Sequence, residues 1–285
     1  MADTFMIRGS IPAVRDSVPI RFVHHRNWDK PENHVLHLNN YLELYVYVEG
    51  NHHFIVENKL YELHRGDVIL INPREVHKAL PLESGIYERF YLLLDVHCLD
   101  GMVCNPLTHI LNLPQHMGNL LSADPEHREQ LLGLLYDLSD CFSKERDRQV
   151  RALGLILQLL DLCNNQLARE QSAQGRIVPV PQLLERILAY VAENTATIQT
   201  TTQVAEALGL SSQYLSAYFS KHIGTPLKIY IQAKKVALAK ELLNRGTDVT
   251  QACFDSGFND CSYFIRVFKK YVGVTPLRYQ QSLYR

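Results

Sequence analysis

The last hundred or so residues of the chain repeat themselves at a period close to 49 residues. Gly209, Tyr214, Phe219, Gly224 and Thr225-Pro226 recur as Gly257, Tyr263, Phe268, Gly273 and Thr275-Pro276. The spacings are 48, 49, 49, 49 and 50 residues. A period this regular indicates two copies of one supersecondary unit. The C-terminal part of the chain must therefore fold around a duplicated element.

Each copy predicts a short helix, a turn that contains glycine, and a second helix. Ser211 or Ser212 can cap the second helix of the first copy, and Asp260 can cap that of the second. A glycine-containing turn between two helices is typical of helix-turn-helix units. A long helical run from Pro226 to Asn244 joins the copies. Two recognition helices on one such connector could enter successive major-groove turns, roughly 34 Å apart.

The charge is distributed unevenly along the 285 residues. From Pro179 to Arg285 there are 12 Lys and Arg against 7 Asp and Glu, whereas the remainder has 17 against 23. The net charge of −1 for the whole chain conceals this asymmetry. A basic C-terminal half joined to an acidic N-terminal half predicts a nucleic-acid contact confined to one domain.

The exposed faces of the two predicted recognition helices indicate which residues meet DNA. Burial of Leu215, Tyr218 and Phe219 in one helix, and of Phe264, Val267 and Phe268 in the other, leaves the opposite faces to solvent. The residues that we predict to bind DNA are Gln213, Ser216, Ala217, Ser220, Lys221, Cys261, Ser262, Arg266, Lys269 and Lys270. Glutamine can bind adenine and arginine can bind guanine in bidentate fashion, while lysine neutralises phosphate. The alternative is an all-α domain that binds protein, because it would need the same buried residues.

The second copy resembles the signature of the AraC/XylS family of regulators. The resemblance is carried by Ala252, Gly257-Phe258, Asp260, Ser262-Tyr263-Phe264, Arg266, Phe268-Lys269-Lys270, Gly273, Thr275-Pro276 and Tyr279, and by Val204-Ala205, Leu208 to Ser211, Tyr214-Leu215 and Phe219 in the first copy. It covers about a hundred residues and implies a double helix-turn-helix domain. By resemblance, Gln213, Ser216 and Ala217 fall on the base-reading positions of the first unit, and Cys261, Ser262 and Arg266 on those of the second.

Three residues depart from the pattern of that family. Ala217 stands where an arginine is common, Lys235 replaces the usual arginine of the connecting helix, and Gln280 replaces the usual closing arginine. Alanine donates no hydrogen bond and can at most contact a thymine methyl group. The first unit is therefore expected to discriminate sequence weakly.

The region from Val18 to Asp95 has the pattern of short strands. Ile20 to Val23, Leu42 to Val48, His53 to Val56, Val68 to Ile71 and Tyr87 to Leu94 are β-rich runs separated by turn residues. This spacing predicts a β-sandwich or a small barrel. His37-x-Asn39-x3-Glu43-x6-Gly50, followed by Gly66-Asp67 and Pro73-x3-His77, resembles the paired motifs of cupin barrels and the effector-binding half of AraC-like regulators.

The interior of this region could be an effector pocket, a metal site or a filled core. A polar pocket for an effector would draw on Trp28, His37, Glu43, Tyr45 and His77, and regulators of this layout often respond to sugars. In a metal cupin, His37, Glu43 and His77 would form a facial triad, with Asn39 in place of a second histidine. In a filled interior, His37 and His77 would satisfy each other. We expect a pocket without a resident metal or cofactor.

Between these regions, the apolar period predicts two amphipathic helices over about 125–170, and residues 171–181 have the composition of a linker. The second helix is apolar almost all round from Leu153 to Leu160, so it either packs on the barrel alone or also forms a subunit interface. We thus predict an α+β two-domain chain: a cupin-like β-barrel with a helical pair in 1–170, the linker 171–181, and an all-α double helix-turn-helix domain in 182–285.

The function predicted from the sequence is a ligand-responsive DNA-binding transcription regulator. It would be a homodimeric activator that contacts RNA polymerase and answers to a sugar or similar metabolite; the alternative is a cupin metalloenzyme with an appended helical domain. Six cysteines without CxxC spacing favour reduced thiols in a cytoplasmic protein. No apolar run is long enough to span a bilayer, so no membrane partner is expected. A transcription regulator is expected to have no enzymatic activity.

Overall fold

The computed structural model describes residues 5–11, 20–29, 36, 38, 41–73, 75–95, 110, 120–122, 124–144, 149–169 and 180–283. Nine strands come first: β1 (Phe5–Ile11), β2 (Ile20–Asp29), β3 (Leu42–Glu49), β4 (His52–Val56), β5 (Lys59–Glu62), β6 (Val68–Ile71), β7 (His77–Pro81), β8 (Gly85–Leu94) and β9 (Leu120–Leu121). We call this part the sheet region. Eight of its strands lie before residue 95, so the predicted strand pattern is confirmed there.

The described strands form two antiparallel sheets. Sheet A has the order β1-β2-β8-β3-β6-β9, and sheet B has the order β5-β4-β7. The alternation of β3 separates two layers: Leu42, Leu44 and Val46 face one core, whereas Tyr45 and Tyr47 face another. That second core also contains residues of sheet B, so it lies between the sheets. Closure into a cupin-like barrel stays a prediction.

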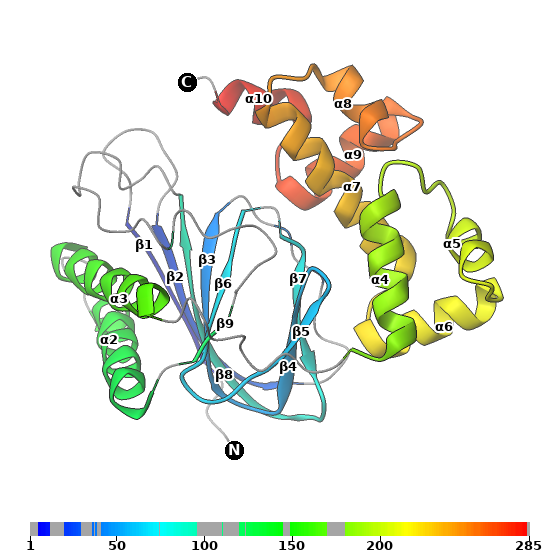
Figure 1. The fold of residues 1–285 in the computed structure, drawn as a ribbon. Coiled ribbons are helices and arrows are strands. Elements are labelled where there is room, and N and C mark those ends of the chain that lie inside the picture. The colour runs from blue at the N-terminus through cyan, green and yellow to red at the C-terminus, as the bar shows by residue number, and fades with distance from the viewer. Residues whose placement is uncertain are drawn as a thin grey trace.

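The helices α2 (Pro125–Lys144) and α3 (Gln149–Arg169) cover the outer face of sheet A (Figure 1). Their leucines share a core with the even-numbered residues of β3. A buried polar link ties α2 to the sheet, because His24 contacts Ser139 at 2.8 Å and Glu88 at 2.9 Å, and Tyr136 also donates to Glu88 at 2.9 Å. Arg26 pairs with the same carboxylate. The predicted helical pair is confirmed.

The described residues from 180 to 283 are mainly helical. They form α4 (Gln182–Asn194), α5 (Thr201–Ala207), α6 (Ser212–Ile223), α7 (Leu227–Asn244), α8 (Val249–Asp255), α9 (Cys261–Val272) and α10 (Pro276–Leu283), which we call the helical region. In Figure 1 this region lies on the side of sheet B, opposite α2 and α3. Four residues before α4 (Leu36, Leu38, Ile55 and Val76) belong to its hydrophobic core. Only Val180 and Pro181 of the predicted linker are among the described residues.

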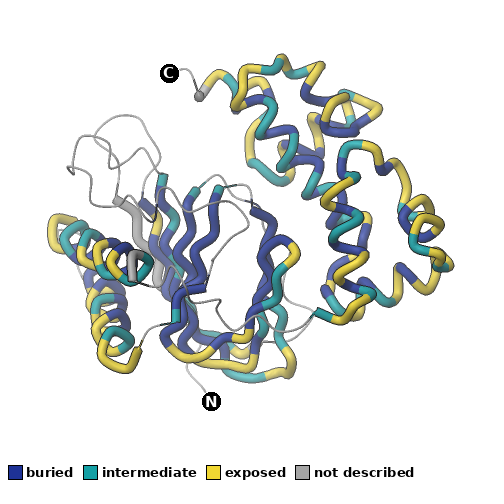
Figure 2. The backbone as a smooth tube through the Cα atoms, in the orientation of Figure 1, coloured by how far each residue is buried: buried dark blue, intermediate teal, exposed yellow. Residues whose placement is uncertain are grey.

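Burial follows this layering. Figure 2 shows the strands of both sheets mainly buried, while the outer sides of α2, α3 and the helical region are exposed. Within the described residues, no helix is both long enough and apolar enough to cross a membrane. The chain is therefore an α+β protein with antiparallel sheets in front and helices behind, as predicted.

Candidate functional site

The first helix pair of the repeat, α5 and α6, is defined by its caps. Ser211 accepts a hydrogen bond from the backbone N–H of Tyr214 at 3.2 Å and so caps α6, one of the two residues predicted for that role. Gly209 lies in the turn with φ +70°, and Gly224 ends α6 with φ +61°. Both conformations favour glycine because a Cβ is strained there. The turn chemistry of the sequence thus sets the geometry of this unit.

The second pair, α8 and α9, repeats the same solution. Asp260 accepts from the backbone N–H of Tyr263 at 2.8 Å and caps α9 as predicted. Gly257 in the turn has φ +87°, and Gly273 ends α9 with φ +84°. Equivalent glycines and caps in both units therefore place α6 and α9 in equivalent positions, joined through α7.

The buried and exposed faces of α6 and α9 agree with the predicted division. Leu215, Phe219, Phe264, Val267 and Phe268 are buried, and Tyr218 is half-buried. Of the residues predicted to bind DNA, Gln213, Ser216, Ala217, Lys221, Ser262, Arg266, Lys269 and Lys270 are exposed, whereas Ser220 and Cys261 are half-buried. These faces offer amide and hydroxyl groups and four cations to a ligand. Their contact with bases or phosphates stays a prediction.

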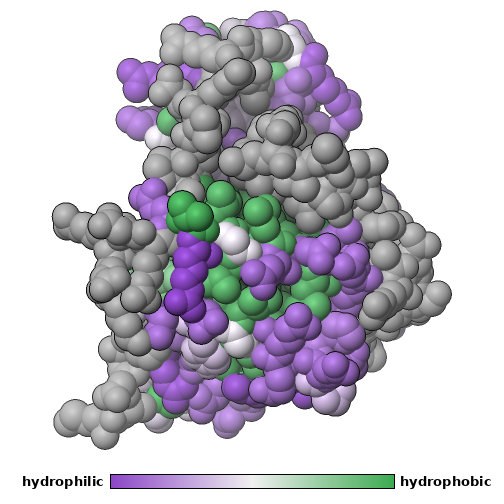
Figure 3. Space-filling model, turned by 90° about the vertical axis from the view of Figure 1, so that its left-hand side faces the viewer, coloured by the Kyte–Doolittle hydropathy of each residue, from purple (hydrophilic) through white to green (hydrophobic). Residues whose placement is uncertain are grey.

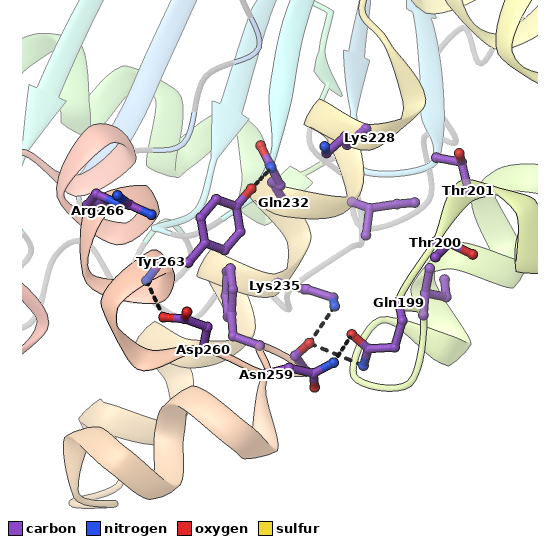
Figure 4. Close-up of a pocket in the computed structure, with 14 residues that line it drawn as sticks. Gln199, Thr200, Thr201, Lys228, Gln232, Lys235, Asn259, Asp260, Tyr263 and Arg266 are labelled. Atoms are coloured by element: carbon purple, nitrogen blue, oxygen red, sulfur yellow. Dashed lines mark hydrogen bonds between the residues drawn. The ribbon is translucent and has the colours of Figure 1, made fainter.

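A cleft of about 640 Å³ lies between the two units. Figure 4 shows Tyr263 and Arg266 of α9 on one side and Gln199, Thr200 and Thr201 on the other, with Lys228, Gln232 and Lys235 of α7 between them. Lys228 is exposed and adds a cation that the sequence reasoning missed. The signal that could have found it was its place in the first turn of the connecting helix.

The base of this cleft is held by hydrogen bonds to one carbonyl group. Lys235 donates to the carbonyl oxygen of Gly257 at 2.5 Å, and Gln199 donates to it at 3.4 Å. Asn259 in turn donates to Gln199 at 2.9 Å. Burial lowers the pKa of Lys235. Lys235, which departs from the pattern of the family, thus ties the turn of the second unit to α7, and Gln199 ties the same turn to the start of the first unit.

Like Lys235, Gln280 holds two segments of the helical region together by a hydrogen bond. Its side-chain amide donates to the carbonyl oxygen of Thr247 at 2.7 Å, which fastens α10 to the segment before α8. Tyr279 of α10 also donates to Asn244 at 2.9 Å. The last helix therefore braces the second unit.

A second candidate site lies between the sheets. Glu43 of β3 and His77 of β7 form a buried pair at 3.3 Å. Burial lowers the pKa of His77, but the charges of Glu43 and Glu75 and the hydrogen bonds to both residues together raise the pKa above its ordinary value. Tyr45 contacts Phe54 with ring centroids 4.4 Å apart, and Phe54 stacks on His77. The structure therefore brings together three of the five residues predicted for effector binding.

The other two predicted residues are not part of this cluster. Trp28 is 58% exposed on β2, so its ring is not enclosed between the sheets where a ligand would stack. His37 lies outside the described residues. Among the described residues, no three His, Cys, Asp or Glu side chains gather closely enough to hold a metal ion.

Sequence reasoning missed several aromatic members of this interior. Tyr87 hydrogen bonds to Tyr45 through their hydroxyl groups, and His52 stacks on Tyr87 with centroids 3.8 Å apart. Tyr47 and Tyr61 belong to the same core. Burial raises the pKa of Tyr45 well above its ordinary value, and it raises that of Tyr47 to about 12. Neutral phenols of this kind donate and accept hydrogen bonds.

The two capped helix pairs, each with an exposed second helix, define the class of helix-turn-helix proteins. Residues 204–282 match the family model described as a helix-turn-helix domain. The chain is 36% identical over 78 residues to the transcriptional activator RhrA of Rhizobium meliloti. This alignment covers 26% of this chain and 24% of the relative. It is 30% identical over 100 residues to the melibiose operon regulatory protein of Escherichia coli, 34% of this chain and 33% of the relative.

A solved structure, the C-terminal domain of the two-component response regulator yesN from Fusobacterium nucleatum, is 35% identical. The structural alignment covers 35% of this chain and 99% of the solved domain, with a TM-score of 0.34. The C-terminal region is thus similar to helix-turn-helix transcription regulators, in agreement with its resemblance to the AraC/XylS family. The alignments span only about a quarter to a third of the first curated relatives.

Proposed function

We propose that the chain regulates transcription by binding duplex DNA with α6 and α9 in successive turns of the major groove. The observation that carries this proposal is the duplicated unit whose second helices keep their polar and cationic faces exposed. Arg266 would bind a guanine and Gln213 an adenine, while Lys269, Lys270 and Lys221 would neutralise phosphates. Ala217 limits the first unit to weak discrimination.

The test is selection of duplexes from a random pool with the full-length protein. We expect an enriched site with two elements about one helical turn apart, of which the one read by α9 is better defined. The selection is repeated with Arg266→Ala, which should blur one base position. Failure to enrich any sequence over the starting pool would overturn the proposed function.

The second part of the proposal is that a small polar metabolite, such as a sugar, binds between the sheets and shifts the protein toward its DNA-binding arrangement. A carboxylate, an imidazole and several phenols around one interior suit a ligand with many hydroxyl groups. Glu43→Gln removes the charge from this interior. Glu62→Gln, on the exposed side of β5, is the matched control.

A thermal-shift screen of sugars and other polar metabolites on the full chain tests this part. A ligand at a hundred times its Kd stabilises a protein by about 2.7 kcal/mol, which gives a measurable rise in Tm. We expect that rise in the wild type and in Glu62→Gln, and its loss in Glu43→Gln. The same rise in all three proteins would place the ligand elsewhere.

We further propose that the protein acts as a homodimeric activator. Figure 3 shows hydrophobic side chains gathered on the face formed by α2 and α3, with hydrophilic side chains below them. On α3, Val150 is 86% exposed, and Leu153 and Leu157 follow it at helical spacing and are half-buried. A second copy of this stripe would bury it. Since RhrA is named an activator, we expect contact with RNA polymerase and a reporter gene that is switched on.

A further inference from the structure

A lysine of the sheet region reaches the end of the first recognition helix. Lys78 on β7 is only 1% exposed. Its Nζ donates to the carbonyl oxygens of Ile223 and Gly224 at 3.0 and 2.7 Å, and it lies 3.0 Å from Oγ1 of Thr225. Ile223 is the last residue of α6, and Gly224 is its C-cap. The ammonium group therefore caps α6 from another part of the chain.

Both the electrostatics and the fit make this contact specific. The last carbonyl groups of a helix lack partners within it and carry the negative end of the helix dipole, so a cation stabilises them. Burial lowers the pKa of Lys78 to about 8, which leaves the side chain mainly charged at neutral pH. A Cβ at position 224 would lie 3.0 Å from Nζ, so only glycine leaves the ammonium group its full room.

The turn between β4 and β5 provides a second contact. Glu57 pairs with Lys234 of α7, and its carbonyl oxygen accepts from the hydroxyl group of Tyr230 at 3.2 Å. Glu57 is also bound to the residue just before the strand that carries Lys78. Its carboxylate accepts a hydrogen bond from the backbone N–H of Val76 at 2.7 Å, and its own N–H donates to the carbonyl oxygen of Val76 at 2.8 Å. Glu57 is held at φ +55°, an uncommon conformation outside glycine.

These contacts adjoin the interior between the sheets. His77 and Lys78 are neighbours on β7, and successive side chains of a strand point to opposite faces. His77 thus meets Glu43 inside, while Lys78 meets α6 outside. Among the described residues, every hydrogen bond between the sheet region and the helical region ends on α6, on α7 or on the corner between them. None of these hydrogen bonds between described residues ends on α8, α9 or α10.

We infer that Lys78 is a positioning residue for DNA recognition, which holds α6 in its binding orientation and connects the interior of the sheet region to the first unit. This inference rests on the proposed function. The docked arrangement leaves Gln213, Ser216 and Ala217 of α6 exposed, so it holds the helix without covering its face. Loss of Lys78 should therefore weaken binding to the half of the site that α6 contacts.

The experiment measures the affinity of the full chain for a duplex selected by the wild-type protein, and for two derivatives with one half scrambled. The half that α9 contacts is identified with Arg266→Ala. This substitution should no longer lower the affinity once that half of the duplex is scrambled. If Lys78→Met occupies the binding orientation about a tenth of the time, its affinity for the intact duplex falls about tenfold. That loss should persist with the α9 half scrambled and vanish with the α6 half scrambled.

Three further variants make the result specific. Lys78→Arg keeps the charge and the donors and should retain more affinity than Lys78→Met. Lys59→Met makes the same charge change in sheet B, where no hydrogen bond joins Lys59 to the described helical region, and should bind like the wild type. Lys234→Met removes the second contact and should show the same half-specific loss. It also serves as the test if Lys78→Met does not fold, as judged by circular dichroism.

The outcomes separate this inference from the proposed function. If the wild-type protein selects no duplex, the proposed function fails. If it selects one but Lys78→Met binds like Lys59→Met, or loses affinity equally on both halves, Lys78 does not position α6. Tighter binding by Lys78→Met would show that the docked arrangement hinders recognition, which would also overturn the inference.

Discussion

The two turn glycines of the repeat offer a matched pair for a stability test. Gly209 and Gly257 occupy equivalent turns with φ +70° and +87°. An alanine in this region of φ costs about 1–2 kcal/mol, and reduced freedom of the unfolded chain returns part of it. A Cβ at position 209 would meet nothing within 4 Å, so we expect Gly209→Ala to lower the free energy of unfolding by about 1 kcal/mol.

Gly257→Ala adds a clash to the same strain. Its Cβ would overlap the backbone carbonyl oxygen of Ala196 and lie 2.8 Å from the carbonyl carbon, so the turn must shift. The shift would loosen the hydrogen bonds that Lys235 and Gln199 donate to Gly257, and a bond from a charged donor is worth about 1.5–3 kcal/mol. The expected loss is about 3–5 kcal/mol.

The assay is urea denaturation of the full chain followed by circular dichroism at 222 nm, because the helical region dominates that signal. The transition of Gly257→Ala should lie at a lower urea concentration than that of Gly209→Ala, with a difference of about 2–4 kcal/mol in the free energy of unfolding. Equal destabilisation of the two variants would show that the contact between the turn and Ala196 has no energetic weight, and the reasoning from the clash would then be wrong.

Three further predictions concern DNA recognition, the buried Glu88 cluster and the subunit interface. Arg266→Ala should cost about 1–3 kcal/mol of binding free energy at one base position, whereas Lys269→Ala should weaken all duplexes alike; anisotropy titrations against single-base variants distinguish the two. Burial raises the pKa of Glu88, but hydrogen bonds from His24, Tyr136 and Arg26 outweigh this and lower the pKa to about 2. The ionised carboxylate therefore stabilises the fold fully above about pH 5, and this stabilisation disappears as the pH falls toward 2. A profile of Tm against pH should be flatter for Glu88→Gln than for the wild type over that interval, and an unchanged profile would refute this. Leu157→Asp should be monomeric in light scattering, whereas the control Gln158→Asp, at the exposed neighbouring position, should stay dimeric. If both variants are dimers, α3 is not the interface.

The local structure of both halves could be predicted because it depends on residues close together in sequence. The helix pairs follow from glycine turns and from caps such as Ser211 and Asp260, whose partners lie three residues away. In β3, the alternation that any strand imposes places Tyr45 and the even-numbered leucines on opposite faces.

Contacts between distant residues could not be predicted in this way. Lys78 contacts the end of α6, which is more than 140 residues away in the sequence. The local sequence around Lys78 is the same as expected for a lysine exposed to solvent. Strand β7 was itself not predicted, because its sequence from His77 to Pro81 lacks the β-branched and aromatic residues that are typical of strands. Tyr87 was assigned to a strand, but its face depends on which strands pair with β8. The exposure of Trp28 likewise follows from its position in the sheet.

The salt dependence of DNA binding tests the central claim most directly. Four exposed cations lie on or beside the recognition faces, namely Lys221, Arg266, Lys269 and Lys270. If each neutralises a phosphate or displaces its counterion, the logarithm of the affinity of the full chain for its selected duplex should fall against the logarithm of the salt concentration with a slope of about −3 to −4. A slope near zero, or no binding at low salt, would contradict DNA recognition by this helical region.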